Sequence, residues 1–269
     1  MKKRNLVLSV MATCLVSCFL LSGCNGQKQI DSETVKTVKV EEQAHLQDDT
    51  VSPACKITID YSYLAKSDAA DSIVQRINRT IQAHILGKEY TRMNPEVAVD
   101  SFKNTYINNY RKDVNEFYQE DIKNGTPKDE LPTWYNYEYG LTTYFSEGKE
   151  GILNFIAETF EYTGGAHPNS WNKWMNFEKN TGKLLALKDV FMAGSEKPIS
   201  DMLLEELITE MATRLEDSSI TSLEGLQNAG ILNSTNMYVP DNFLLEKEKV
   251  SFLYLSLIHI SEPTRLLSI

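Results

Sequence analysis

The chain has 269 residues, with 27 Lys and Arg against 37 Asp and Glu, so its formal net charge is −10. An acidic chain of this kind is repelled by nucleic acid and by anionic membrane surfaces, and no nucleic-acid partner is expected. It would attract a cationic partner instead. Its length suits one globular domain with a substantial core, once the two unusual ends of the chain are set aside.

The amino-terminal segment has the features of a secretory signal. Three basic residues at positions 2–4 precede an apolar run over residues 6–21, which is shorter than the ~20 residues that span a bilayer. The following "LSGC", ending at Cys24, resembles the lipobox of bacterial lipoproteins. The resemblance implies a signal peptide over residues 1–23 and a lipid, such as palmitate, on Cys24. The protein would then be a membrane-anchored lipoprotein of the cell envelope, periplasmic or surface-exposed.

The segment after the lipobox is polar. Residues 25–52 show no sustained apolar period, so residues 24–52 are predicted to be the acylated cysteine and a flexible tether. Residues 24–254 hold 23 basic and 36 acidic residues, a net charge of −13. Cys24 and Cys55 are the only cysteines in that range. Cys55 occupies the same face of the predicted strand as the isoleucines two and four residues later, so it is predicted to be a small buried residue rather than a reactive thiol.

One α+β domain is predicted over residues 53–254. The segment 55–64 alternates with period two and is typical of a strand. Isoleucines four apart then indicate a helix that ends before Gly87, and a second, long helix begins at Pro95 and ends at Gly125.

The second half of the chain changes to a strand period. Residues 133–165 predict a hairpin, residues 171–187 a second one that turns at Asn180–Gly182, residues 196–217 a helix, and residues 237–254 two short strands. The order is roughly βααβββαββ, a largely antiparallel sheet with helices packed on one face.

The stretch "YTGGAHPNS", residues 162–170, lies between two predicted strands and has several interpretations. The structural one is a tight connection, in which Gly164 and Gly165 supply positive φ angles and Pro168 fixes its own φ. A phosphate loop would need a helix after the glycines, whereas the residues that follow are typical of a strand. A metal site on His167 would need further ligands, which no spacing demands, so neither a metal nor another cofactor is expected. A Ser–His–Asp hydrolase would need a nucleophile elbow, which is absent from the sequence.

The same stretch carries a resemblance. "YTGGAHPN" followed by "FEKNTGKLLALKDVF" at residues 177–191 is similar to an extracellular domain of unknown function. That domain is shared by lysozyme-sensing anti-sigma factors of Gram-positive bacteria and by the amino-terminal region of certain peptidoglycan deacetylases. The match over residues 53–254 implies recognition rather than catalysis. Only Gly164, Gly165, Ala166, His167 and Pro168 correspond to the family's loop, and they form the candidate binding loop.

The carboxyl-terminal segment differs in character from the rest. Residues 255–265, "LSLIHISEPTR", resemble a translated sequencing-library adapter. Residues 255–269 are therefore predicted to be a non-native tail, and the domain to be truncated near Tyr254.

The predicted function is binding, and the chain is not expected to be an enzyme. The partner would be a muramidase-like protein such as lysozyme, or a cell-wall glycan of peptidoglycan, with the membrane contacted only through the lipid. The candidate contact residues are the aromatics Trp134, Tyr135, Trp171 and Trp174, for which packing within the sheet is an equally good interpretation. The alternatives are a peptidoglycan hydrolase with His167 as general base beside Glu158, Glu161 or Asp189, and a passive structural lipoprotein.

Overall fold

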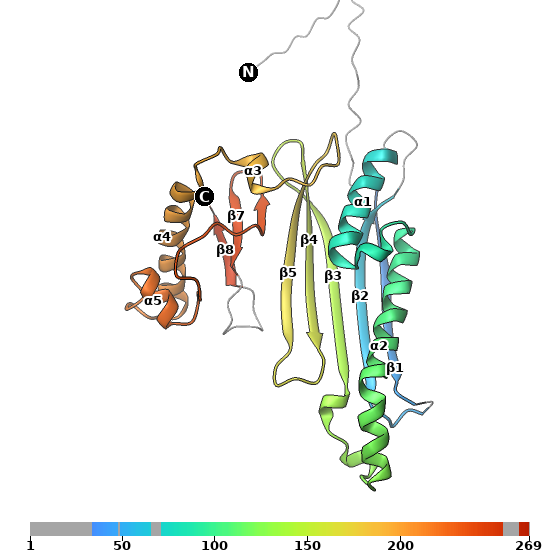
Figure 1. Ribbon diagram of the computed structural model, residues 1–269. Helices are drawn as coiled ribbons and strands as arrows, with labels where there is room; N and C mark the ends of the chain where they lie inside the picture. Colours follow the sequence, from blue (N-terminus) through green and yellow to red (C-terminus); the bar gives the residue numbers. More distant parts are fainter. Residues whose placement is uncertain (1–33, 48, 66–70, 255–263, 269) are drawn as a thin grey trace, which may run out of the picture.

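The structure is a computed structural model that describes residues 34–47, 49–65, 71–254 and 264–268. It contains two sheets that lie side by side (Figure 1). We call the five-stranded sheet with its two covering helices the large lobe, and the part from residue 187 onward the small lobe. Cys24 and the signal segment lie outside the described residues.

The large lobe is built on the strands β1 (Val35–His45), β2 (Ala54–Leu64), β3 (Tyr137–Glu147), β4 (Ile152–Tyr162) and β5 (Asn169–Glu178). They lie in sequence order across the sheet. The β2–β3 pair is parallel, whereas the other three pairs are antiparallel. Parallel neighbours need a long crossover, and here two helices form it.

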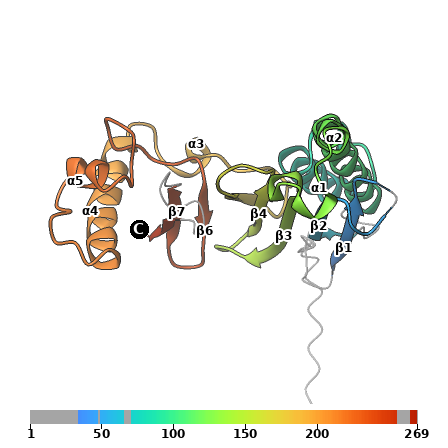
Figure 2. The same cartoon turned by 90° about the horizontal axis from the view of Figure 1, so that it is seen from below.

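These two crossover helices, α1 (Asp71–Ile85) and α2 (Pro95–Lys123), cover one face of the sheet (Figure 2). Pro95 occupies the first turn of α2, where its missing N–H costs nothing, and the Asn94 side chain accepts a hydrogen bond from the backbone N–H of Glu96. The four-residue spacing of isoleucines puts Ile77 and Ile81 of α1 on the buried side. They pack in one core with the inward residues of β2, which are Cys55, Ile57, Ile59 and Tyr61.

The small lobe has shorter elements. They are α3 (Leu187–Val190), α4 (Glu196–Arg214), α5 (Leu223–Asn228), β6 (Phe243–Leu245), β7 (Val250–Tyr254) and β8 (Thr264–Ser268). Short 3₁₀ turns also occur in the large lobe, at Lys88–Tyr90, Lys128–Glu130 and Thr133–Tyr135. The small lobe has its own core, in which α4 contributes Ile199, Leu203 and Leu207.

Three asparagines join the two lobes. Asn176 on β5 donates from Nδ2 to the Phe243 carbonyl (2.9 Å) and accepts at Oδ1 from the Leu245 N–H (2.8 Å). Asn154 donates to the Leu245 carbonyl (3.0 Å), and Asn242 accepts from the Trp174 N–H (2.8 Å). Side-chain amides thus attach β6 and the residue before it to β4 and β5, beside one backbone bond from the Lys149 N–H to the Leu245 carbonyl (3.1 Å).

The predicted fold class and element order are confirmed, and the additional elements are β1, α3, α5 and β8. The prediction of a flexible tether as far as residue 52 is wrong for Val35–His45, which pair with β2 along their whole length. The turn at Asn180–Gly182 forms, but the strand expected after it is reduced to one bridge, Phe177–Leu184. Residues 264–268 pair with β7. An extended chain of any origin can form such backbone pairs, so this pairing does not test whether residues 255–269 are native. Their non-native origin stays a prediction.

Candidate functional site

The "TGGAHP" stretch forms the loop between β4 and β5, at the end of the large sheet that lies lowest in Figure 1. Gly164 has φ +82°, and a Cβ atom there would clash with the backbone carbonyl oxygen of Trp134. Gly165 has no such contact, since the nearest atom to its Cβ position would be 3.8 Å away. Gly164 is therefore required by backbone geometry, because it lets the loop lie directly against the Thr133–Tyr135 turn.

Two aromatic side chains are exposed beside this loop. The Trp134 ring is 39% exposed and lies 3.9 Å, centroid to centroid, from the Tyr135 ring. Phe117 of α2 is 54% exposed and packs edge-on against Trp134 at 6.1 Å. We call the loop over residues 163–168, together with Trp134 and Phe117, the loop surface. An exposed aromatic pair on a rigid base is a common feature of protein interfaces.

Tyr135 anchors this surface from below and takes no part in it. Its side chain is 1% exposed, and its hydroxyl donates a hydrogen bond to Oδ2 of Asp121 (2.8 Å). Burial, reinforced by that hydrogen bond, raises the pKa of Tyr135 to about 12. The expectation that Tyr135 is an exposed contact residue is wrong, because its ring is buried beneath Trp134 and its hydroxyl is bonded to Asp121.

Trp171 and Trp174 lie farther along β5, on opposite faces of the strand. Trp171 is partly exposed, opposite Thr159 of β4. Trp174 is only 9% exposed and packs with Ile156, Leu244 and Leu253 between the lobes. Its proposed role as an exposed contact is also wrong, because β6 and β7 cover that part of the sheet.

His167 is exposed in the loop, and the three carboxylates proposed as its partners bond elsewhere. Glu161 accepts from the Tyr106 hydroxyl (2.9 Å), Glu158 lies 3.5 Å from the Tyr144 hydroxyl, and Asp189 pairs with Lys183 (2.6 Å). Among the residues that the structure describes, none of the three bonds to His167. The pairing that a general base would need is therefore not formed in this arrangement.

The described residues form neither a metal site nor a membrane-spanning helix. Within them, no group of three or more His, Cys, Asp or Glu side chains is placed to hold a metal ion. No described helix combines the length and apolarity needed to cross a membrane. Cys55 is fully buried, as predicted, and burial raises the pKa of its thiol to about 12.

Phe117 is a surface residue that the sequence pattern does not single out. It stands between apolar residues of α2, of which Val114 and Tyr118 are buried. Tyr110, Val114 and Tyr118 follow one another in four-residue steps along the buried side of the helix, whereas Phe117 lies outside that series, at the exposed edge of this side. A strict four-residue count along the helix would have placed Phe117 outside the core.

Known proteins are similar to this chain in both sequence and structure. Residues 50–170 match the family model described as Deacetylase PdaC. The crystal structure of a DUF3298-family protein from Bacteroides fragilis has a TM-score of 0.77 and 26% sequence identity, over 90% of this chain and 92% of that one. A DUF3298-family protein from Pseudomonas aeruginosa has a TM-score of 0.54 at 14% identity, over 86% and 88% of the two chains, and shows the fold alone. No curated protein matches the chain. The chain is thus similar over most of its length to a DUF3298-family structure, and over residues 50–170 to the deacetylase PdaC model.

Proposed function

We propose that the chain is a lipid-anchored cell-envelope protein whose loop surface binds a cationic, muramidase-like protein without catalysing a reaction. The observation that carries this proposal is the exposed pair of Phe117 and Trp134, fixed in place by the close approach of Gly164 to the Trp134 backbone. Rigid aromatic side chains of this kind lose little conformational entropy on binding and often dominate the affinity of an interface.

Charge around this pair supports a cationic partner. Asp113 and Glu120 are exposed on α2, four residues before and three residues after Phe117, so they lie on the same face of the helix. Glu116, next to Phe117, is exposed as well. The net charge of −13 over residues 24–254 adds a long-range attraction that would accelerate association and weaken with salt.

A cell-wall glycan is the second candidate partner, and a different surface favours it. Tyr144 and Phe160 are exposed on the sheet face opposite the helices, and Glu158 lies between them in register. Flat aromatic rings beside a carboxylate offer a stacking surface and a hydrogen-bond acceptor to a sugar ring. This candidate requires no part of the loop surface, so the two can be tested separately.

The test is a binding measurement with the chain from residue 24 carrying Cys24→Ser. Hen egg-white lysozyme and purified peptidoglycan are each offered at low and moderate salt. We expect saturable binding to lysozyme, with Phe117→Ala and Trp134→Ala each weakening it about tenfold or more. Trp171 is the other exposed tryptophan among the candidate contacts, but it lies outside the loop surface, so Trp171→Ala should leave the affinity unchanged.

Three outcomes would contradict the proposal. Absence of lysozyme binding would exclude lysozyme as the partner. Equal effects of Trp171→Ala and Trp134→Ala on the affinity would exclude the loop surface as the binding site. Binding to peptidoglycan alone, sensitive to Tyr144→Ala, would select the glycan instead. Lipid attachment is checked by metabolic labelling with palmitate, which Cys24→Ser should abolish.

A further inference from the structure

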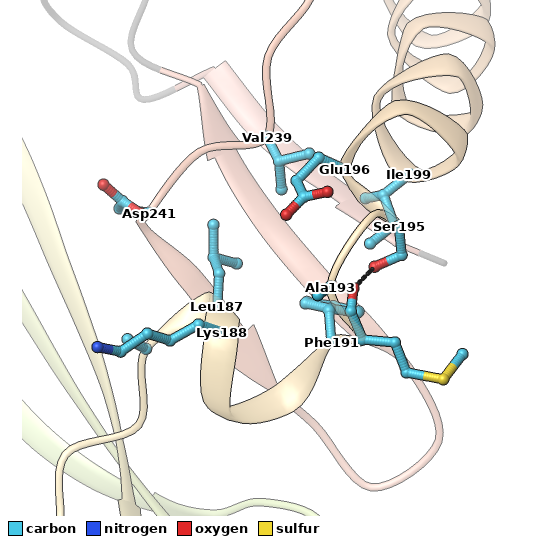
Figure 3. Close-up of a pocket in the computed structure, with 11 residues that line it drawn as sticks. Leu187, Lys188, Phe191, Ala193, Ser195, Glu196, Ile199, Val239 and Asp241 are labelled. Atoms are coloured by element: carbon cyan, nitrogen blue, oxygen red, sulfur yellow. Dashed lines mark hydrogen bonds between the residues drawn. The ribbon is translucent and has the colours of Figure 1, made fainter.

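An apolar cavity in the small lobe is used by none of the features above. Its volume is about 380 Å³, and it lies between α3, the first turn of α4 and the segment that leads into β6 (Figure 3). Leu187, Phe191, Ile199 and Val239 provide its apolar lining. A space of this size accommodates a large side chain or a small ligand.

The cavity continues along α4 into a second, more open one of about 600 Å³. The two share Leu187, Glu196 and Val239, and the second extends to Leu204 and Tyr238. We call the two together the α4 groove. Its rim carries Met192, 84% exposed, and Tyr238, 44% exposed. Flexible Met and amphipathic Tyr side chains are enriched where proteins bind other proteins.

One acidic side chain, the exposed Glu196, lies at the edge of this apolar space. Figure 3 shows the Glu196 carboxylate directed between Leu187 and Val239, whereas the Lys188 amine extends away from it. Within the part of the chain that the structure describes, the side chains of Glu196 and Asp241, the two acidic lining residues, form no hydrogen bond or ion pair. The nearby Lys197 is already bound to Asp201 (2.8 Å), and the Ser195 hydroxyl donates to the Met192 carbonyl (2.6 Å).

We propose that the α4 groove binds a segment of a partner protein that places a large apolar side chain next to a Lys or Arg. The apolar side chain fills the smaller cavity, and the basic one pairs with Glu196. Two connected cavities along α4, both open to solvent, fit an extended peptide better than a compact ligand. The site is separate from the loop surface and does not depend on lysozyme as the partner.

Three dipeptides with blocked termini, which differ only in the charge of one side chain, test the site. N-acetyl-Trp-Lys-amide, N-acetyl-Trp-Gln-amide and N-acetyl-Trp-Glu-amide share one aromatic side chain and differ only in charge. Binding is followed by NMR on the carbon-13 methyl groups of methionine, using the chain from residue 24 with Cys24→Ser. Met192 and Met237 line the groove, whereas Met175 is buried in the core of the large lobe and serves as an internal control.

We expect the Lys probe to shift the Met192 and Met237 signals saturably and to leave the Met175 signal in place. It should bind more tightly than the Gln probe, and the Glu probe should bind most weakly. Glu196→Gln should weaken the Lys probe about two- to fivefold and leave the Gln probe unaffected, as for a partly exposed ion pair. Glu210→Gln, on an exposed part of α4 outside both cavities, should change neither.

Ala193→Trp provides a second, independent variant. Ala193 is an exposed lining residue, so the larger side chain can occupy the cavity without displacing the core. It should abolish the methyl shifts while the fold is retained. Absence of any shift with all three probes would overturn the proposal, and so would persistent binding to the Ala193→Trp variant. Equal affinity for the Lys and Glu probes would overturn the assignment of a basic partner residue.

Discussion

The two lobes achieve stability in different ways. The strands of the large lobe are 10 or 11 residues long and bond to one another through continuous backbone ladders. In the small lobe β6 has only three residues, and it is attached to the large sheet through asparagine side chains. We infer that the large lobe can persist when the small lobe opens, whereas the small lobe depends on the large one. The following predictions test that asymmetry, from the largest expected effect to the smallest.

Replacing a buried phenylalanine by alanine should have the largest effect, and it should show whether the two lobes unfold separately. Phe155 is fully buried in the large lobe, 5.0 Å from Phe145. Phe155→Ala should lower the free energy of unfolding by about 3–5 kcal/mol, because it removes buried apolar surface and leaves a cavity. In the Cys24→Ser background, labelling of the buried Cys55 thiol reports opening of this core. Phe252→Ala, fully buried in the small lobe, should open that lobe while Cys55 stays protected. Equal labelling of Cys55 in both variants would show that the lobes unfold as one unit.

The hydrogen bonds of Asn154, Asn176 and Asn242 between the lobes, here called the asparagine junction, should determine the stability of the small lobe alone. Asn176→Ala leaves the Phe243 carbonyl and the Leu245 N–H without their partners, which costs about 2–4 kcal/mol. Hydrogen exchange should accelerate in β6 and β7 and change little in β1 to β3. Asn172→Ala is the control, since only the Asn172 backbone carbonyl takes part in the junction. Faster exchange throughout the large sheet would contradict the proposed direction of dependence.

At the other end of the molecule, Gly164 should affect the large lobe alone. Gly164→Ala places a Cβ at φ +82°, against the Trp134 carbonyl, and should cost about 1–3 kcal/mol. The Cβ of Gly165→Ala meets only an ordinary contact with the His167 carbonyl at 3.8 Å, so this substitution should be nearly neutral. Thermal unfolding measures the difference, and tryptophan fluorescence should report displacement of Trp134. Equal effects of the two substitutions would mean that the loop moves away from the turn at little cost.

The smallest effect concerns pH and the Asp49–Lys128 pair. Hydrogen bonds from the Lys128 amine and from Ser52 hold the pKa of Asp49 below its ordinary value of 3.8. A lowered pKa stabilises the fold above 3.8, and this stabilisation is lost as the pH falls below that value. Asp49→Asn should therefore lower Tm slightly at pH 7, and the difference from the parent should disappear in strong acid. The effect is small because the pair is solvent-exposed. A difference in Tm between the two proteins that stays constant at all pH values would exclude this mechanism.

The sequence predicts those elements whose side chains show a complete period. Ile73, Ile77, Ile81 and Ile85 identify α1, and the alternation from Cys55 to Tyr61 identifies β2. β1 escaped prediction because it is an edge strand with several charged residues, and only one of its faces touches the core. Its position depends on the β2 backbone, to which it pairs over all 11 residues.

The candidate site was predictable only in part, for a similar reason. A glycine pair between two strands correctly located the β4–β5 loop. Composition identified the aromatic residues but not the direction of each ring, so exposed Trp134 and buried Tyr135 looked equivalent. The α4 groove unites residues from three segments, represented by Leu187, Glu196 and Val239, and no local pattern connects them.

The parallel β2–β3 pair also sets the order in which the large sheet can form. Ser62 and Thr143, which bond across this pair, are 81 residues apart. β2 can therefore pair with β1 at once, whereas its pairing with β3 requires closure of a long loop. Until that loop closes, β2 has an unpaired edge on one side. Such an edge can pair with a neighbouring chain, so we expect aggregation during refolding to be fastest before β3 joins the sheet.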